Sequence, residues 1–140
     1  YFRLAEIYLN YAEALNEYAP GNPDIERYVN LVRERSDQPA LPNGLTQDEM
    51  RERIRRERRV ELAFEEHRAW DVRRWKVASS TLGAPLKGMR IERDNTQATP
   101  TYTYTPYVVE QRVFQPKMYW YPIPQSELLK LKGWKQNPQW

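Results

Sequence analysis

The chain has 140 residues, 40% of them apolar and 29% charged, and a mean hydropathy of -0.92. No stretch approaches the roughly 20 apolar residues that a membrane-spanning helix needs, and the absence of cysteine excludes disulfides, thiol catalysis and thiolate metal sites. The net charge is +3, but seven arginines between Asp48 and Arg68 are matched by seven acids. Phosphate binding needs an unopposed basic stripe, so the charge pattern disfavours nucleic acid as a partner.

The first two predicted helices form an antiparallel hairpin over residues 2–36. Apolar residues spaced for one helix face predict a helix over 2–18: Leu4, Ile7, Tyr8, Tyr11, Leu15 and Tyr18. Pro20 and Gly21 end it, Asn22 can cap the next helix, and Pro23 suits a first helical turn. The second helix is expected to end near Ser36. By their spacing, four tyrosines are expected in the core: Tyr8, Tyr11, Tyr18 and Tyr28.

A second helical pair is predicted over residues 47–78. Thr46 and Glu49 have the spacing of a capping box, which places the start of the third helix at Gln47. No proline or glycine occurs from Leu45 to Leu82, which supports a helix to about Glu66. A further helix over about 69–78 is expected to follow a bend near His67 or Arg68.

Two acidic residues of the third helix fall on its apolar face. The expected apolar stripe consists of Met50, Ile54, Val60 and Phe64. Glu57 and Glu61 lie inside this stripe, and a buried carboxylate must be paired and hydrogen-bonded or neutralised. We therefore predict a structural ion-pair network in which arginines meet these two acids: Arg58, Arg68, Arg73 or Arg74.

The region over residues 79–121 has a different character, with prolines, glycines and a Thr–Tyr alternation from Thr99 to Thr105 that only Pro100 interrupts. Such alternation predicts a short exposed strand or hairpin. A possible second edge consists of Val108, Val109, Val113 and Phe114. A last short helix, roughly Gln125 to Lys132, is expected to end at Gly133, and together with the tail it makes up residues 122–140.

Three tyrosines of the irregular region are the candidate ligand contacts: Tyr102, Tyr104 and Tyr107. A sugar stacks its C–H face on an aromatic ring while neighbouring polar groups take its hydroxyls. An ordered loop or edge strand without a ligand explains the same pattern, and that alternative is the commoner one.

The sequence carries no pattern typical of a catalyst. Glycoside hydrolysis needs two carboxyl groups on opposite sides of a bond, whereas Glu57 and Glu61 lie one turn apart on one helix. His67 is the only histidine, which removes paired-histidine zinc sites, and no glycine-rich phosphate loop is present. We expect no metal, no cofactor and no enzymatic activity.

Three sequence blocks in order carry a resemblance to a known family. The first is RLAEIYLNYAEALN over 3–16, the second IRRERRVELAFEEHRAWDVRRW over 54–75, and the third YPIPQSE over 121–127 with QNP over 136–138. The helical pairs are also similar to tetratricopeptide units. Together the blocks resemble the C-terminal part of the SusD/RagB family of outer-membrane nutrient-binding lipoproteins.

The resemblance implies a mainly α, SusD-like fold of tetratricopeptide-like hairpins with an irregular or short β-hairpin insertion. It also implies a parent protein anchored by an N-terminal lipid on the outer face of the outer membrane. There the parent would bind an oligosaccharide or peptide and partner a SusC-like TonB-dependent transporter. We expect 1–140 to be the C-terminal part of such a protein, mainly scaffold, with the N-terminal part and anchor absent. The alternative is an intracellular tetratricopeptide-type adaptor that grips a partner peptide.

Overall fold

The computed structural model describes residues 2–96 and 99–140. The chain forms two compact units, one up to Trp70 and one from Asp71 onward. Each unit is described below by itself.

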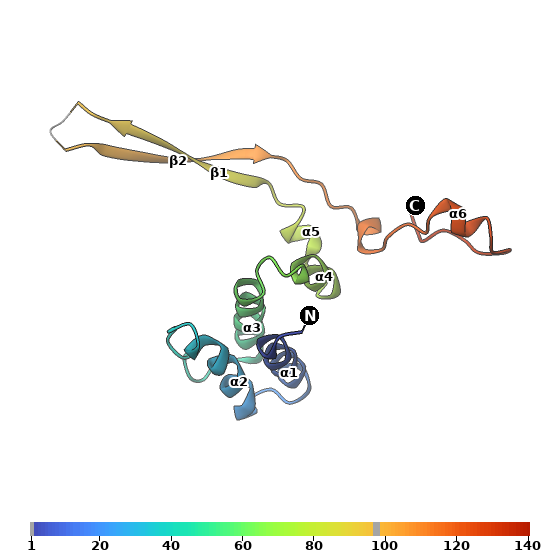
Figure 1. Cartoon of the computed structure of the whole chain (residues 1–140), viewed down its shortest axis with the longest axis horizontal. Helices are drawn as coiled ribbons and strands as arrows, with labels where there is room; N and C mark the ends of the chain where they lie inside the picture. The colour runs from blue at the N-terminus through green and yellow to red at the C-terminus, as the bar shows by residue number, and fades with distance from the viewer. Residues whose placement is uncertain (1, 97–98) are drawn as a thin grey trace. The chain divides into compact units, whose positions relative to one another are not determined.

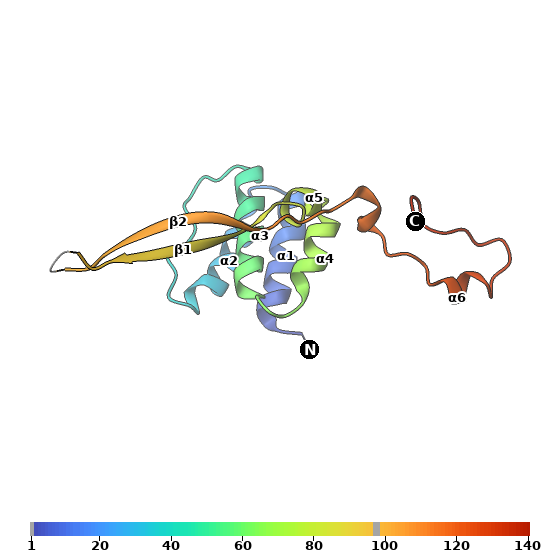
Figure 2. The same cartoon turned by 90° about the horizontal axis from the view of Figure 1, so that it is seen from above.

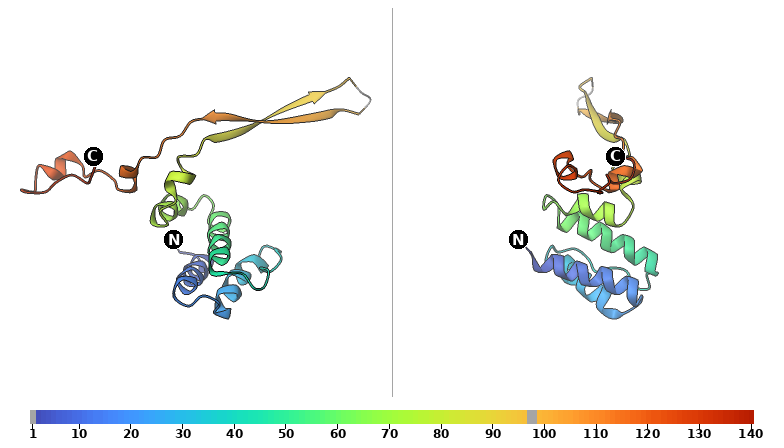
Figure 3. Two further views of the ribbon diagram at one scale, coloured as in Figure 1. Left: turned by 180° about the vertical axis from the view of Figure 1, so that it is seen from behind. Right: turned by 90° about the vertical axis from the view of Figure 1, so that its right-hand side faces the viewer.

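The first unit is a helical bundle built from α1 (Leu4–Tyr18), α2 (Pro23–Glu34) and α3 (Gln47–Glu61). α1 packs against both other helices, and the three lie side by side in every view (Figure 1, Figure 2 and Figure 3). Apolar side chains from all three helices and from the loop before α3 form its buried core: Leu9, Ala12, Ile25, Val29, Val32, Leu41, Met50 and Ile54.

Capping side chains set where α2 and α3 begin, as the sequence predicts. The Asn22 side chain accepts a hydrogen bond from the Asp24 backbone N–H, and Pro23 occupies the first turn of α2. Thr46 and Glu49 form the predicted capping box at the start of α3. These groups satisfy backbone N–H donors that have no partner within the helix.

The apolar stripe of α3 is shorter than predicted. Met50 and Ile54 are buried, but Val60 is 66% exposed and Phe64 fully exposed. α3 ends at Glu61, and Phe64 and Glu66 then take left-handed backbone conformations, with φ of 64° at both. The helix therefore ends before the expected Glu66, and the break precedes the expected bend at His67 or Arg68. Arg58, only 4% exposed, continues the buried face beyond Ile54 because its aliphatic stem can pack as an apolar group.

Two of the four tyrosines expected in the core are exposed. Tyr8 and Tyr28 are half-buried beside the core, with ring centroids 5.0 Å apart. Tyr11 is 44% exposed, although its ring meets that of Tyr28 edge-on, and Tyr18 is 89% exposed. The helical spacing is correct, but the side of α1 that is fully buried against α2 and α3 carries Leu9 and Ala12, and Tyr18 lies outside it.

The predicted helix over 69–78 is two shorter helices. α4 (His67–Arg74) continues from the first unit into the second, and α5 (Ala78–Thr81) follows a turn in which Lys76 has a φ of 58°. The second unit ends with a 3-10 helix, η1 (Pro116–Tyr119), and with α6 (Gln125–Leu128). α6 stops short of the predicted Lys132.

A two-stranded antiparallel ribbon of β1 (Leu86–Asp94) and β2 (Thr101–Glu110) dominates the second unit (Figure 1). The predicted Thr–Tyr strand is present, but Val108 and Val109 belong to that same strand, while Val113 and Phe114 lie beyond it. The partner strand is β1, which the sequence does not predict because its apolar residues do not alternate strictly. The mainly helical fold with a short hairpin is confirmed.

Replacing Thr46 with Ala tests the cap of α3. We expect the free energy of unfolding to fall by about 1 kcal/mol, because the Glu49 N–H loses its acceptor and the box opens. Thermal melts measure the change. Ser36→Ala, at an exposed position beyond α2, is the control and should change stability by less than about 0.5 kcal/mol. Equal melting of the two variants would contradict a stabilising role for the cap.

Candidate functional site

Glu57 of α3 forms an ion pair with an arginine of α2. Arg33 Nη1 donates to Glu57 Oε2 over 2.7 Å, and the two side chains are 19% and 14% exposed. The Arg33 Nε donates to the Pro39 carbonyl oxygen at 2.8 Å, so the guanidinium has a second fixed partner. This pair connects α2 to α3 at the edge of the core.

Glu61 is held by arginines from two other segments. Arg3, which precedes α1, donates to Glu61 Oε1 and to the Glu61 carbonyl oxygen, both over 2.8 Å. Arg35, just after α2, donates to both carboxylate oxygens at 2.8 and 2.7 Å. The Glu61 side chain is only 7% exposed, so its charge is compensated where it is largely removed from water.

Arg3 also contacts the more exposed Glu65. Its Nε and Nη2 donate to the two carboxylate oxygens of Glu65 at 2.9 and 2.6 Å, a bidentate pair. These hydrogen bonds to Arg3 lower the pKa of Glu65, and the bonds to Glu65 and Glu61 raise the pKa of Arg3. In the same way, hydrogen bonds from Arg51 of α3 lower the pKa of Glu17 of α1.

The partners of Glu57 and Glu61 therefore differ from the arginines that the sequence suggested. Arg58 donates to the Asn10 side chain and lies 3.9 Å from Glu13 of α1. Being one residue from Glu57, it points to another face of α3. In the second unit Arg74 pairs with Asp71 at 2.9 Å, and Arg73 donates to the Met118 carbonyl oxygen at 3.3 Å. Arg68 lies on α4.

One face of the β-ribbon gathers exposed apolar side chains. In the register, Ile91 pairs with Tyr104 and Met89 with Pro106. Because side chains alternate between faces, these four residues and Tyr102 share one face. Tyr102 is 51% exposed and Tyr104 60% exposed. The two tyrosines can therefore present their rings to a ligand from the same side.

Tyr107 lies on the opposite face of the ribbon, and its ring packs against other residues of the ribbon. Its ring lies over Gly88, where an added Cβ would be 3.1 Å from the ring and 2.8 Å from Val109 Cγ2. The Arg90 guanidinium carbon stands 5.6 Å from the centre of the same ring. The three candidate tyrosines thus divide between the two faces of the ribbon: Tyr102 and Tyr104 lie on one face, and Tyr107, which is 45% exposed, packs over Gly88 on the other.

The two segments of the third sequence block, 121–127 and 136–138, are hydrogen-bonded to each other. Gln136 accepts from the Ile123 N–H at 2.7 Å and donates to the Ile123 carbonyl oxygen at 2.9 Å, as a neighbouring strand would. Asn137 donates to the Tyr121 carbonyl oxygen at 2.7 Å, and the Trp140 indole donates to the Trp120 carbonyl oxygen at 3.1 Å. The amide side chains of the tail therefore fix the extended segment before α6.

Within residues 2–96 and 99–140 no group of His, Asp and Glu side chains is placed to hold a metal ion. In the same ranges, none of the helices has both the length and the apolar composition needed to cross a bilayer.

The helical bundle, the β-ribbon and the hydrogen-bonded C-terminal segment make up a mainly α fold with one β-hairpin. The model of the SusD family matches residues 1–140, and the chain belongs to that family. The resemblance carried by the three sequence blocks is confirmed.

Relatives and solved structures agree with this assignment. SusD-like protein P2 of Formosa agariphila is 43% identical over 88 residues, which are 58% of this chain and 17% of that protein. A SusD-like protein from Bacteroides fragilis is 34% identical with a TM-score of 0.80, covering 97% of this chain and 25% of that one. A SusD-like carbohydrate-binding protein from the same species is 32% identical with a TM-score of 0.73, covering 92% and 27%. The chain thus spans about a quarter or less of these proteins.

Acid titration of stability tests the role of Arg3. The pKa of Glu65 is lower in the folded chain than in the unfolded one, so its ion pair stabilises the fold above the unfolded pKa, about 4.3. This contribution is lost as pH falls through the lower folded-state pKa. We expect Arg3→Met to reduce stability at neutral pH and to make the acid-side loss of stability shallower.

Urea unfolding at a series of pH values measures this dependence. Arg27→Met is the matched control, because Arg27 is 68% exposed and stands 3.6 Å from Asp24. It should leave the pH profile unchanged. A profile of Arg3→Met parallel to that of the unmodified chain would contradict the assignment.

Proposed function

We propose that this chain is part of a cell-surface nutrient-binding protein that captures a glycan and passes it to a transporter. Membership in the SusD family is the observation that carries this proposal. A structural neighbour described as carbohydrate-binding, with a TM-score of 0.73, supports a glycan as the ligand. We propose binding without cleavage, because Glu57 and Glu61 form ion pairs with arginines and lie on one helix, not on opposite sides of a glycosidic bond.

The partner that we propose is a SusC-like TonB-dependent transporter in the outer membrane. Within a longer SusD-like protein, this chain would supply the C-terminal part, carried at the extracellular face by a lipid anchor elsewhere in the polypeptide. The first unit would act mainly as scaffold, because ion pairs such as Arg33–Glu57 and Arg51–Glu17 join its helices to one another. The family match favours this function over an intracellular tetratricopeptide adaptor.

The exposed face of the ribbon is the proposed glycan contact within this chain. Tyr102 and Tyr104 lie two residues apart on β2, so their side chains are about 6.5 to 7 Å apart along the strand. Rings at that spacing can meet neighbouring parts of one oligosaccharide. Met89 and Ile91, across the register, extend the apolar surface. An apolar platform with nearby polar groups is the usual composition of a sugar-binding surface.

Changing both Tyr102 and Tyr104 to Ala tests the proposed contact. A glycan-array screen of the full-length gene product first identifies an oligosaccharide, and calorimetry then measures its affinity. We expect the double variant to bind at least about tenfold more weakly, since two stacking contacts of the order of 1 kcal/mol each are lost.

Thr103→Ala with Thr105→Ala is the matched control. These residues interleave with the two tyrosines on β2 and lie on the opposite face, so their loss should leave the affinity unchanged. Circular dichroism checks that both variants keep their fold. Equal affinity of the tyrosine variant and the unmodified protein would remove the ribbon face from the ligand site. The absence of any glycan ligand would contradict the proposed function itself.

A further inference from the structure

The edge of β1 that faces away from β2 is open to another strand. Over residues 2–96 and 99–140, β1 pairs with β2 alone, in a sheet of two strands (Figure 1). Both strands are exposed along almost their whole length. A two-stranded ribbon is only marginally stable in water, and further strands stabilise it. The free edge of β1 is therefore a place where a strand can be added.

The two edges of the ribbon differ in their capacity to accept a strand. β2 contains Pro106, which has no N–H to donate, whereas β1 contains no proline. Pro106 lies opposite Met89, and a proline in a strand is found where its nitrogen points away from the neighbouring strand. Met89 then directs its own N–H and C=O to the free edge, and so does Ile91 two residues further on.

The charges of β1 are complementary to those of a second, antiparallel β1. A two-fold axis through Ile91 places this residue opposite its own copy, and it places Arg90 opposite Glu92 of the second copy. The symmetry generates the Arg90–Glu92 pair twice, and cross-strand pairs of opposite charge stabilise a sheet. Asp94 faces Gly88 in this register, so no like charges of β1 lie directly opposite each other.

The neighbouring registers bring like charges together. With the axis at Arg90, this residue would lie opposite its own copy, and with the axis at Glu92 the two carboxylates would meet. Like charges directly opposite each other destabilise a sheet. An axis between two residues would pair side chains that belong to opposite faces of the ribbon. The sequence of β1 therefore favours the register centred on Ile91.

We propose that two copies of this protein pair through the free edges of β1, antiparallel and centred on Ile91. The pairing forms a four-stranded sheet in the order β2–β1–β1–β2. On one face, Met89 and Ile91 of both copies lie between the two Tyr104 side chains, so the apolar surface becomes continuous across the dimer. The inference goes beyond the proposed capture of a glycan and does not depend on it.

Charge reversal tests the pairing and its register. Arg90→Glu places acid opposite acid, and Glu92→Arg places base opposite base. Each single variant should therefore dimerise at least about tenfold more weakly than the unmodified protein. A mixture of the two variants restores both pairs of opposite charge, so mixed dimers should form with nearly the original affinity. Sedimentation equilibrium of the full-length gene product, up to about 1 mM, measures the dissociation constants.

Glu110→Arg is the matched control for charge reversal. Glu110 is an exposed residue at the end of β2, outside the paired edge, so its reversal should leave the dissociation constant unchanged. Circular dichroism checks that all variants keep their fold. The mixing experiment remains decisive because two variants that had lost their structure would not recover dimerisation when combined.

Cysteine cross-linking locates the axis. Ile91→Cys brings two thiols together at the centre of the dimer, so mild oxidation should link two copies covalently. Thr105→Cys lies on β2, one strand further from the axis, and should form no more cross-linked dimer than the unmodified protein. Cross-linking at residue 105 and not at residue 91 would contradict the proposed arrangement.

Three further results would overturn the proposal. A full-length protein that stays monomeric over the whole concentration range would exclude the pairing. Dimers that persist in both single variants, or a mixture that does not recover, would place the contact elsewhere. Glycan affinity is a separate readout, because Arg90 lies on the face opposite Tyr102 and Tyr104, and Arg90→Glu should leave this affinity unchanged.

Discussion

The first unit depends on the compensation of acidic side chains that α3 carries into its packed face. Glu57 and Glu61 are at most 14% exposed, and an unpaired carboxylate there would cost several kcal/mol. Their partners come from outside α3: Arg33 from α2, Arg3 from before α1 and Arg35 from after α2. The ion pairs thus connect the ends of all three helices. Each of these three arginines forms an ion pair with a carboxylate of α3, which indicates a structural role for them.

The β-ribbon, in contrast, buries few side chains and therefore has little hydrophobic core of its own. Both strands are exposed along almost their whole length, and a lone two-stranded ribbon is marginally stable in water. Internal contacts stabilise it locally, among them the Tyr107 ring over Gly88. The face with Tyr102 and Tyr104 keeps its apolar surface available. The proposed scaffold and the proposed contact surface thus lie in different units of the chain.

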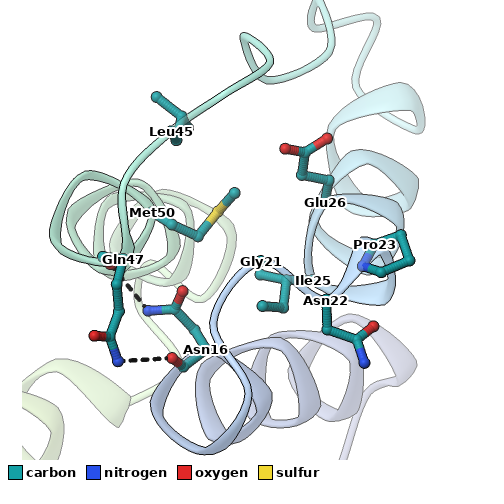
Figure 4. Close-up of a pocket in the computed structure, with 9 residues that line it drawn as sticks. All are labelled: Asn16, Gly21, Asn22, Pro23, Ile25, Glu26, Leu45, Gln47 and Met50. Atoms are coloured by element: carbon teal, nitrogen blue, oxygen red, sulfur yellow. Dashed lines mark hydrogen bonds between the residues drawn. The ribbon is translucent and has the colours of Figure 1, made fainter.

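The contact between α1 and the start of α3 includes a buried amide side chain (Figure 4). Asn16 occupies a buried position of α1 one turn beyond Ala12, where an apolar residue would complete the stripe. An amide at such a position can hold the start of α3 through Gln47, but it leaves one acceptor over.

The sequence by itself determined the features that arise within a few residues. These are the starts of α2 and α3, fixed by the Asn22 cap and the Thr46–Glu49 box, the helical periodicity, and the strand with Tyr102 and Tyr104. The family could also be read from its three blocks. Only the tertiary structure decided which partners meet across long separations: Arg3 with Glu61, β1 with β2, and Asn16 with Gln47. It also decided which side of α1 is buried, leaving Tyr18 in solvent, because burial depends on the neighbour that a face meets and not on its spacing alone.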